Sequence, residues 1–340
     1  MHTPYELHPP IEPYHSGYLA VSGPGDAAHE LYFEESGNPD GQPALFLHGG
    51  PGGGTRPQVR QFFDPAVTRI VLLDQRGAGK SRPNVADDFD AALNGNNTQA
   101  LIADLEALRA HLGVDVWALV VGGSWGSTLG IAYAQAHPER VRKLLLRGVF
   151  TFLRDEVDAL FRSGASAAHY PDAWEAYAGF IEGHPRLRPE QRHDLLEGYR
   201  VLLADPTTRD AAARAFVGYE LALSKLFRDE AAIAASLENP SRLIPFASLE
   251  VAYMLADGYL APGQLLKPDN LARMRGIEIS VVHGRNDHVC LPRAAWRLCR
   301  ALDGVGVPVA LHFVDGAGHS DSEPRIANAL RREADRMVRA

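Results

Sequence analysis

Short apolar runs that stop abruptly in glycine-rich or charged turns recur along this chain, and they restrict its fold more than any other feature. Apolar segments of this length, bounded by turn residues, are typical of strands buried on both faces of a parallel sheet. Two earlier extended stretches, 17–22 and 30–35, predict edge strands. The expected buried strands are 44–47, 70–73, 117–121, 141–149, 279–282 and 309–314.

Helical patterns lie between these runs. Thr98 is expected to cap a helix that Gly113 ends, and its apolar face comprises Leu101, Leu105, Leu108 and Leu112. A second helix is expected from Ser127 to about His137, because Pro138 cannot continue it. Strands that alternate with helices predict an α/β protein with a mostly parallel, doubly wound sheet.

The alternation breaks between about Phe152 and Gly263. That stretch has helical patterns and no clear buried strand; the patterns cover 155–162, 189–204 and 209–226. We therefore expect a core domain made of residues 1–151 and 264–340, with residues 152–263 inserted as a helical cap.

The run Gly122-Gly123-Ser124-Trp125-Gly126 fits G-x-S-x-G and lies between an expected strand and an expected helix. Glycines on both sides let the chain make a tight, strained turn that exposes the serine hydroxyl above the sheet. A glycine-rich turn with an incidental serine is the alternative, but the strand and helix on either side favour the nucleophile turn of the α/β-hydrolase fold.

A serine hydroxyl needs a base that is held by a carboxylate, and this fold supplies them in the order Ser, Asp, His, each after a strand. Asp287 follows the expected strand 279–282, and His319 follows 309–314. Most loop Asp and His residues are solvated surface groups, but three placements in the right order make coincidence improbable. We predict Ser124 as nucleophile, His319 as general base and Asp287 as the acid that orients it.

The run His48-Gly49-Gly50-Pro51 follows the third expected strand, where this fold supplies a backbone N–H to the oxyanion hole. Gly50 is the predicted donor from this loop. The second is the N–H of Trp125, which directly follows the nucleophile.

Composition and motif searches exclude several other classes. A net charge of -8 without basic clusters argues against nucleic-acid binding. We expect no membrane span, and the two cysteines and the N-terminal sequence predict a cytoplasmic protein. Gly79-Lys80-Ser81 resembles the end of a P-loop, but Asp74 stands where its first glycine belongs. We find neither a dinucleotide fingerprint nor H-E-x-x-H, so no cofactor or metal is expected.

With these residues in view, nearly the whole chain resembles the proline iminopeptidases, a family of α/β-hydrolase serine peptidases. The resemblance implies an enzyme that releases an N-terminal residue, usually proline, from a small peptide or aminoacyl substrate with a free amine. It rests on HGGPG (48–52), DQRGAGKS (74–81), GGSWGS (122–127), LRGVF (146–150), GRND (284–287) with Cys290, and GAGHS (316–320).

Glu220 and Glu250 are single carboxylates in mainly apolar stretches of the expected cap. A buried ionised carboxylate needs a cationic partner, and a substrate ammonium would serve. The alternatives are water or structural pairs, and the candidate cations are Arg214, Lys225, Arg228 and Arg242. The family resemblance implies that the two glutamates hold the substrate's amino group.

The chain departs from the family at the wall that faces proline. Members commonly have Trp-x-x-Trp-Glu before the first glutamate, whereas here those positions are Phe216 and Tyr219. The wall expected to face proline, which includes the substrate-binding candidate Tyr219, is therefore altered. The resemblance assigns Phe150 to the apolar pocket, where it would still offer an apolar face to a pyrrolidine ring.

Two other readings remain open at this point. One is an esterase or amidase of the same fold that acts on a small metabolite, because fold does not fix substrate. The other is a binding protein without catalysis, which usually lacks a triad member. None is missing here.

Overall fold

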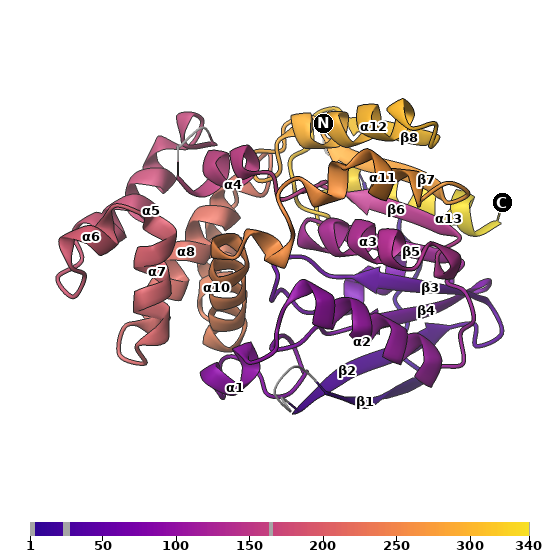
Figure 1. The fold of residues 1–340 in the computed structure, drawn as a ribbon, viewed down its shortest axis with the longest axis horizontal. Helices are drawn as coiled ribbons and strands as arrows, with labels where there is room; N and C mark the ends of the chain where they lie inside the picture. Colours follow the sequence, from indigo (N-terminus) through magenta and orange to yellow (C-terminus); the bar gives the residue numbers. More distant parts are fainter. Residues whose placement is uncertain (1–3, 23–27, 163–165, 340) are drawn as a thin grey trace.

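The centre of the molecule is an eight-stranded sheet (Figure 1). The structure is a computed structural model that describes residues 4–22, 28–162 and 166–339. Along the sheet the strands are ordered β1-β2-β4-β3-β5-β6-β7-β8. Their bounds are β1 His15–Ser22, β2 Ala28–Gly37, β3 Gln42–Leu47, β4 Thr68–Leu73, β5 Leu119–Gly123, β6 Lys143–Arg147, β7 Glu278–Gly284 and β8 Val309–Val314.

The six strands from β3 to β8 run parallel to one another. Strand β2 is antiparallel to both of its neighbours, β1 and β4. The α/β fold expected from the apolar runs is therefore confirmed. One detail differs: of the two strands predicted to be edges, β1 is an edge, but β2 lies inside the sheet between β1 and β4. Since the carboxyl ends of the parallel strands meet at one edge of the sheet, the turns after β3, β5, β6, β7 and β8 come together there.

Helices cover both faces of the sheet and enclose two apolar clusters. On one face lie α2 Thr98–His111, α3 Trp125–Ala136 and α12 Pro292–Gly304; on the other lie α13 Pro324–Arg339 and the 3₁₀ helix η2 Pro57–Phe62. Two short helices, α1 Phe89–Leu93 and α11 Pro268–Ala272, lie in the connections. In the described ranges, helices fall short of the length and apolar character that a bilayer span requires.

Between β6 and β7 the chain forms a helical insertion, which lies beside the sheet layers in Figure 1. The pattern over 189–204 gives two helices instead of one, because Asp194 interrupts it and caps the second through the N–H groups of Leu196 and Glu197. The insertion contains α4 Arg154–Phe161, α5 Pro171–Glu182, α6 Pro189–Arg192, α7 Leu195–Ala204, α8 Arg209–Leu223, α9 Glu230–Leu237 and α10 Pro240–Leu255.

The N-terminal cap of α2 differs from the expected one. Asn97 is the capping residue, and its side-chain oxygen accepts a hydrogen bond from the N–H of Ala100 at 2.9 Å. Thr98 is the first helical residue, and its hydroxyl donates instead to the carbonyl of Gly258. Thr98 thus ties α2 to the segment after α10, a long-range role that local sequence does not reveal.

We predict that Asn97→Ala lowers the free energy of unfolding by about 1 kcal/mol, because the first turn of α2 loses its side-chain acceptor. Asn97→Gly lets water reach the freed N–H groups, so it should lower the free energy of unfolding by only about a few tenths of a kcal/mol. Urea unfolding followed by circular dichroism measures both. Equal stability of Asn97→Ala and the unchanged protein would show that the cap contributes nothing.

Candidate active site

Ser124 occupies a strained turn between β5 and α3. Its backbone has φ 58° and ψ -126°, a left-handed conformation that non-glycine residues rarely adopt. The flanking glycines have no room for a side chain: a Cβ on Gly122 would lie 2.1 Å from the carbonyl oxygen of Gly126. A Cβ on Gly126 would lie 2.1 Å from that of Leu47. Close packing therefore requires glycine at both positions and holds Ser124 above the sheet.

Asp287 and His319 follow β7 and β8, and their side chains meet. His319 Nδ1 lies 2.8 Å from Asp287 Oδ2, while Oδ1 of Asp287 accepts the N–H groups of Val289 and Cys290 at 3.0 and 2.8 Å. Burial opposes ionisation of Asp287, but the imidazoles of His319 and His283 and the hydrogen bond from the N–H of Cys290 together outweigh it, so the pKa of Asp287 lies below its ordinary value. Asp287 is thus an ionised carboxylate that holds the Nδ1–H of His319.

The other imidazole nitrogen meets a residue to which the sequence had assigned no role. Arg147, the last residue of β6, is buried, and its Nη1 lies 3.0 Å from His319 Nε2 and 3.2 Å from the His319 carbonyl oxygen. A guanidinium can only donate, so Nε2 carries no proton. Among the described residues, Ser124 Oγ has no hydrogen bond to this nitrogen. The only hint in the sequence was that the apolar strand β6 ends in an arginine, at the edge of the sheet where Ser124, Asp287 and His319 were expected.

The loop after β3 packs against Ser124. A Cβ on Gly49 would lie 3.1 Å from the Cβ of Ser124, and Gly50 has φ +108°, which suits glycine alone. Trp125 is the first residue of α3, and the first N–H groups of a helix have no partner within it. The loop that carries Gly50 and the first residue of α3, Trp125, thus both adjoin Ser124.

Gln75, to which no individual role was assigned from the sequence, ties the loop of Gly50 to the segment of Trp125. Its backbone N–H donates to His48 Nε2, and its side-chain amide donates to the His48 carbonyl, both at 3.0 Å. Its side-chain oxygen accepts the indole N–H of Trp125 at 2.8 Å. Burial lowers the pKa of His48, so the ring is neutral and can accept that hydrogen bond.

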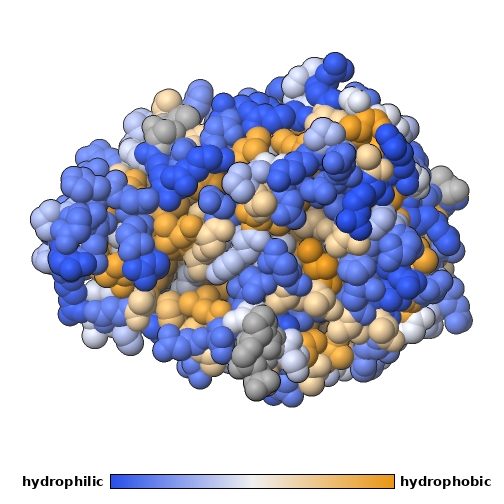
Figure 2. Space-filling view, in the orientation of Figure 1, coloured by the Kyte–Doolittle hydropathy of each residue, from blue (hydrophilic) through white to orange (hydrophobic). Residues whose placement is uncertain are grey.

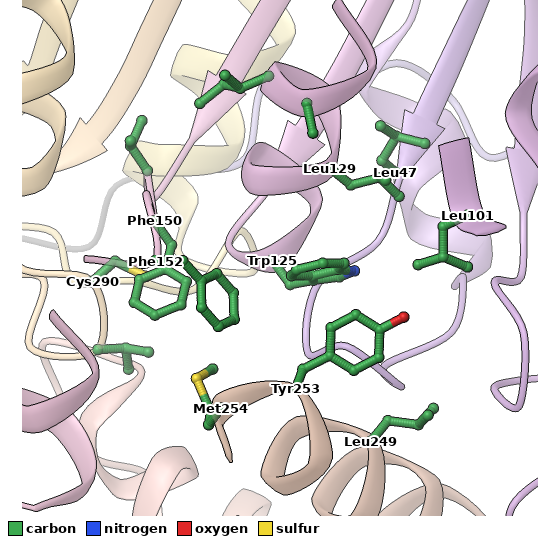
Figure 3. Packing of buried hydrophobic residues seen from close by; sticks show 14 of the residues in the cluster. Leu47, Leu101, Trp125, Leu129, Phe150, Phe152, Leu249, Tyr253, Met254 and Cys290 are labelled. Carbon is green, nitrogen blue, oxygen red and sulfur yellow. The ribbon is translucent and has the colours of Figure 1, made fainter. Parts of the chain in front are cut away.

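The indole of Trp125 points away from the reacting side of the turn. It packs edge-on against Tyr253 and Phe152, with ring centroids 4.8 and 5.7 Å away (Figure 3). Tyr253 belongs to α10, so this aromatic contact joins the nucleophile turn to the helical insertion. The Trp125 side chain is therefore committed to packing, and only its backbone N–H is left for the predicted oxyanion hole.

A cavity of about 450 Å³ opens above Ser124, between the sheet edge and the insertion. It brings together three predicted residues from the sheet domain, Gly50, Ser124 and His319, with Glu220 from α8. Figure 2 shows apolar side chains gathered around α8 and α10, where the insertion meets the sheet layers. Segments of α8, α9 and α10 form the wall opposite the catalytic edge.

Glu220 and Glu250 lie side by side and buried, with exposed fractions of 8% and 3%. In each carboxyl group, Oε2 has no hydrogen-bond partner among the described residues. Burial raises the pKa of Glu220, against opposing contributions from Glu250 and His319. Burial, and then the charge of Glu220, raises the pKa of Glu250 well above its ordinary range. The pair is a buried acidic site whose cation is not supplied by the described chain.

The structural partners considered for these glutamates are engaged or lie elsewhere. Arg214 pairs with Asp210, and Arg228 pairs with Asp172 and Glu230. Lys225 and Arg242 form no ion pair with either glutamate in the described part of the chain, and Arg242 lines the cavity. A salt bridge inside the insertion therefore does not explain the buried carboxylates.

Phe150 and Tyr219 are buried, and neither belongs to the lining of the 450 Å³ cavity. Phe150 packs on Phe152 at 4.6 Å, beside Cys290 in Figure 3. Tyr219 stacks on Tyr177 at 4.7 Å in an aromatic cluster within the insertion. Burial raises the pKa of the Cys290 thiol well above its ordinary value, which makes it a poor nucleophile.

Comparisons with known proteins agree with this architecture. Residues 43–206 match a family model described as alpha/beta hydrolase fold. Among solved structures, a proline iminopeptidase-related protein from Thermus thermophilus superposes with a TM-score of 0.56 at 19% identity, covering 96% of this chain and 98% of its own. An esterase from Exiguobacterium antarcticum gives 0.61 at 17% identity, with 95% and 99% covered. At sequence identities this low, the structural similarity shows a shared fold and says nothing about a shared activity.

Curated relatives are much more similar in sequence. A probable proline iminopeptidase from Leptolyngbya boryana is 43% identical over 98% of this chain and 97% of its own length. The proline iminopeptidase of Arabidopsis thaliana is 43% identical over 95% of this chain and 80% of its own, and that of Neisseria meningitidis serogroup B is 40% identical over 94% of each. Similarity of this extent, on a chain whose strand ends carry the geometry above, means that the chain belongs to the proline iminopeptidase family of α/β hydrolases.

Proposed function

We propose that this protein is a serine aminopeptidase that releases an N-terminal residue, most readily proline, from short peptides. The observation that carries the proposal is the pair of buried carboxyl groups of Glu220 and Glu250, each with an unpartnered oxygen, because Glu220 lines the same cavity as Ser124 and His319. An ammonium ion is the cation that such a pair would accept from a peptide. The names of the curated relatives support proline as the residue released.

In the proposed reaction, His319 Nε2 takes the proton of Ser124 while Ser124 Oγ attacks the scissile carbonyl. The 2.8 Å contact between His319 Nδ1 and Asp287 supports this role, because the carboxylate stabilises the imidazolium that forms. Arg147 donates a hydrogen bond to His319 Nε2, so this bond must break before Nε2 can accept the proton of Ser124. Catalytic hydrogen bonds commonly tighten only in the substrate complex.

The N–H groups of Gly50 and Trp125 would then stabilise the oxyanion of the tetrahedral intermediate. Its collapse transfers the proton from His319 to the leaving peptide amine and leaves the first residue esterified to Ser124. Water, activated by His319, hydrolyses this ester in the second half of the reaction.

Residues 152–263, the proposed cap, would select the substrate by its free amino end. Bringing the ammonium between Glu220 and Glu250 relieves their mutual repulsion, so an N-terminal residue binds far better than an internal one. An enclosed site for the amine limits release to one residue at a time. Phe150 and Tyr219 are proposed to shape the neighbouring apolar wall.

Ser124→Ala should lower peptide cleavage by several orders of magnitude without unfolding the protein, because the nucleophile is lost. A fluorophosphonate probe should label the unchanged protein at Ser124, as located by peptide mapping. Labelling of Ser224 or Ser320, which line the same cavity, would contradict the assignment.

Glu220→Gln and Glu250→Gln should each reduce kcat/KM for prolyl peptides by about tenfold to a hundredfold, because each removes a charge-assisted hydrogen bond to the ammonium. Hydrolysis of a small neutral ester should change little, since Ser124, His319 and Asp287 are untouched. Steady-state kinetics on both substrates measures the contrast.

Acetylation of the substrate amine provides the control for this contrast. It should harm the unchanged protein far more than either glutamine variant. Equal losses on peptide and ester would argue instead for a hydrolase whose cap carboxylates have no contact with an amine.

The same glutamates predict an unusual dependence of stability on pH. The folded pKa of Glu250 is raised above its unfolded value of about 4.3, so its stabilising contribution is complete at acid pH and is lost as pH rises through the folded pKa. The amide in Glu250→Gln does not ionise, so this variant lacks that dependence of stability on pH. Its melting temperature should match the unchanged protein near pH 4 and exceed it near pH 8, by about 2 °C for each kcal/mol of relieved repulsion.

Glu197→Gln is the matched control for this measurement. Glu197 pairs with the exposed Arg200 on α7, and that hydrogen bond lowers the pKa of Glu197. Its substitution should leave stability unchanged or slightly lower at pH 8. A Glu250→Gln variant that melts lower than the unchanged protein at pH 8 would show that Glu250 has a stabilising partner.

A further inference from the structure

Among the described residues, one arginine in the wall of the cavity, Arg242, has no ionic partner. Of the three arginines that line it, Arg147 donates to His319, and Arg56 pairs with Asp321 at 2.5 Å. Arg242 is exposed and, among the described residues, forms no ion pair. The cavity wall therefore carries Glu220, which lies beside Glu250, in one part and an uncompensated positive charge in another.

Helix α10 fixes the order of these charges. Asn239, Arg242, Leu243 and Phe246 all line the cavity, which defines the face that α10 presents to it. Glu250 continues that face, one turn beyond Phe246. At 1.5 Å per residue, Arg242 and Glu250 are separated by about 12 Å along the helix axis, with Phe246 midway.

Phe246 stands level with the loop that carries Gly50. A Cβ on Gly52 would lie 2.9 Å from the Cα of Phe246 and 2.5 Å from the carbonyl oxygen of Pro245, so α10 touches that loop directly. The scissile carbonyl must lie at this level, beside Ser124. Arg242 is about 6 Å further along, on the side away from Glu250.

From these contacts, and on the basis of the aminopeptidase function proposed above, we infer that Arg242 binds the C-terminal carboxylate of the leaving peptide and makes zwitterionic di- and tripeptides the preferred substrates. An extended peptide advances about 3.5 Å per residue. The carboxylate of a dipeptide or tripeptide therefore lies about 3.5 or 7 Å beyond the scissile bond, within reach of the flexible Arg242 side chain. A longer peptide places its terminus outside this reach.

The test compares free acids with C-terminal amides. Pro-Ala, Pro-Ala-Ala and Pro followed by five alanines are each assayed in both forms with the unchanged protein, Arg242→Gln and Arg200→Gln. Arg200 is an exposed arginine on α7 that pairs with Glu197 and does not line the cavity. Melting temperatures establish that each variant is folded.

The unchanged protein and Arg200→Gln should cleave the free di- and tripeptides about fivefold more efficiently than the amides, mainly through KM, as expected for a partly exposed ion pair. The hexapeptide should show no such preference. Arg242→Gln should abolish the preference for the short peptides, and Arg242→Glu should reverse it.

Cleavage of acids and amides at equal rates by the unchanged protein would overturn the role of Arg242 and leave the aminopeptidase function standing. A preference that survives in Arg242→Gln, or extends to the hexapeptide, would also overturn it. Failure to cleave any of the prolyl peptides would reject the proposed function itself.

Discussion

The whole site depends on how closely β5 and α3 approach the end of β3. A single carbon at Gly122 or Gly126 would collide with a backbone oxygen at 2.1 Å, so this approach exists only because both residues are glycine. It forces Ser124 into its left-handed conformation and makes Trp125 the first residue of α3. Gln75 then ties Trp125 to His48, which fixes the loop of Gly50 relative to the nucleophile.

Sequence reasoning succeeded where the physics is local and repetitive. Apolar runs ending in turn residues identified the parallel strands, and the strand ends in turn identified Ser124, Asp287 and His319 as neighbours. It was less successful where a partner is distant in sequence. The side chain of Thr98 looks like a cap but bonds to Gly258, and Arg147 looks like the polar end of a strand but reaches His319. Neither contact leaves a periodic signal.

In the helical insertion too, local sequence patterns did not predict features that depend on packing between distant segments. Its helices were foreseen as a group, but α10 contains Pro245, which argues locally against a helix, and the pattern over 189–204 concealed the break at Asp194. Packing decides these cases, because α10 is held against α7 and α8 and its Tyr253 packs on Trp125. Glu250 could be named from its apolar surroundings, whereas its proximity to Glu220 follows only from how α8 and α10 pack.

That proximity explains why the insertion is built from well-packed aromatic residues. Burial of two carboxyl groups and the repulsion between them destabilise the fold that holds them together, and the raised pKa of Glu250 reflects both penalties, burial first. Around α8, Tyr177 stacks on Tyr199 and Tyr219, and Phe216 packs edge-on against Tyr177 and Tyr199, which holds the helix in place against the repulsion. Looser packing of the insertion would let α8 and α10 move apart and would separate the two carboxyl groups. Phe216 and Tyr219 both pack on Tyr177 in this aromatic cluster, so the two residues that differ from the family tryptophans still help to position Glu220, which directly follows Tyr219 on α8.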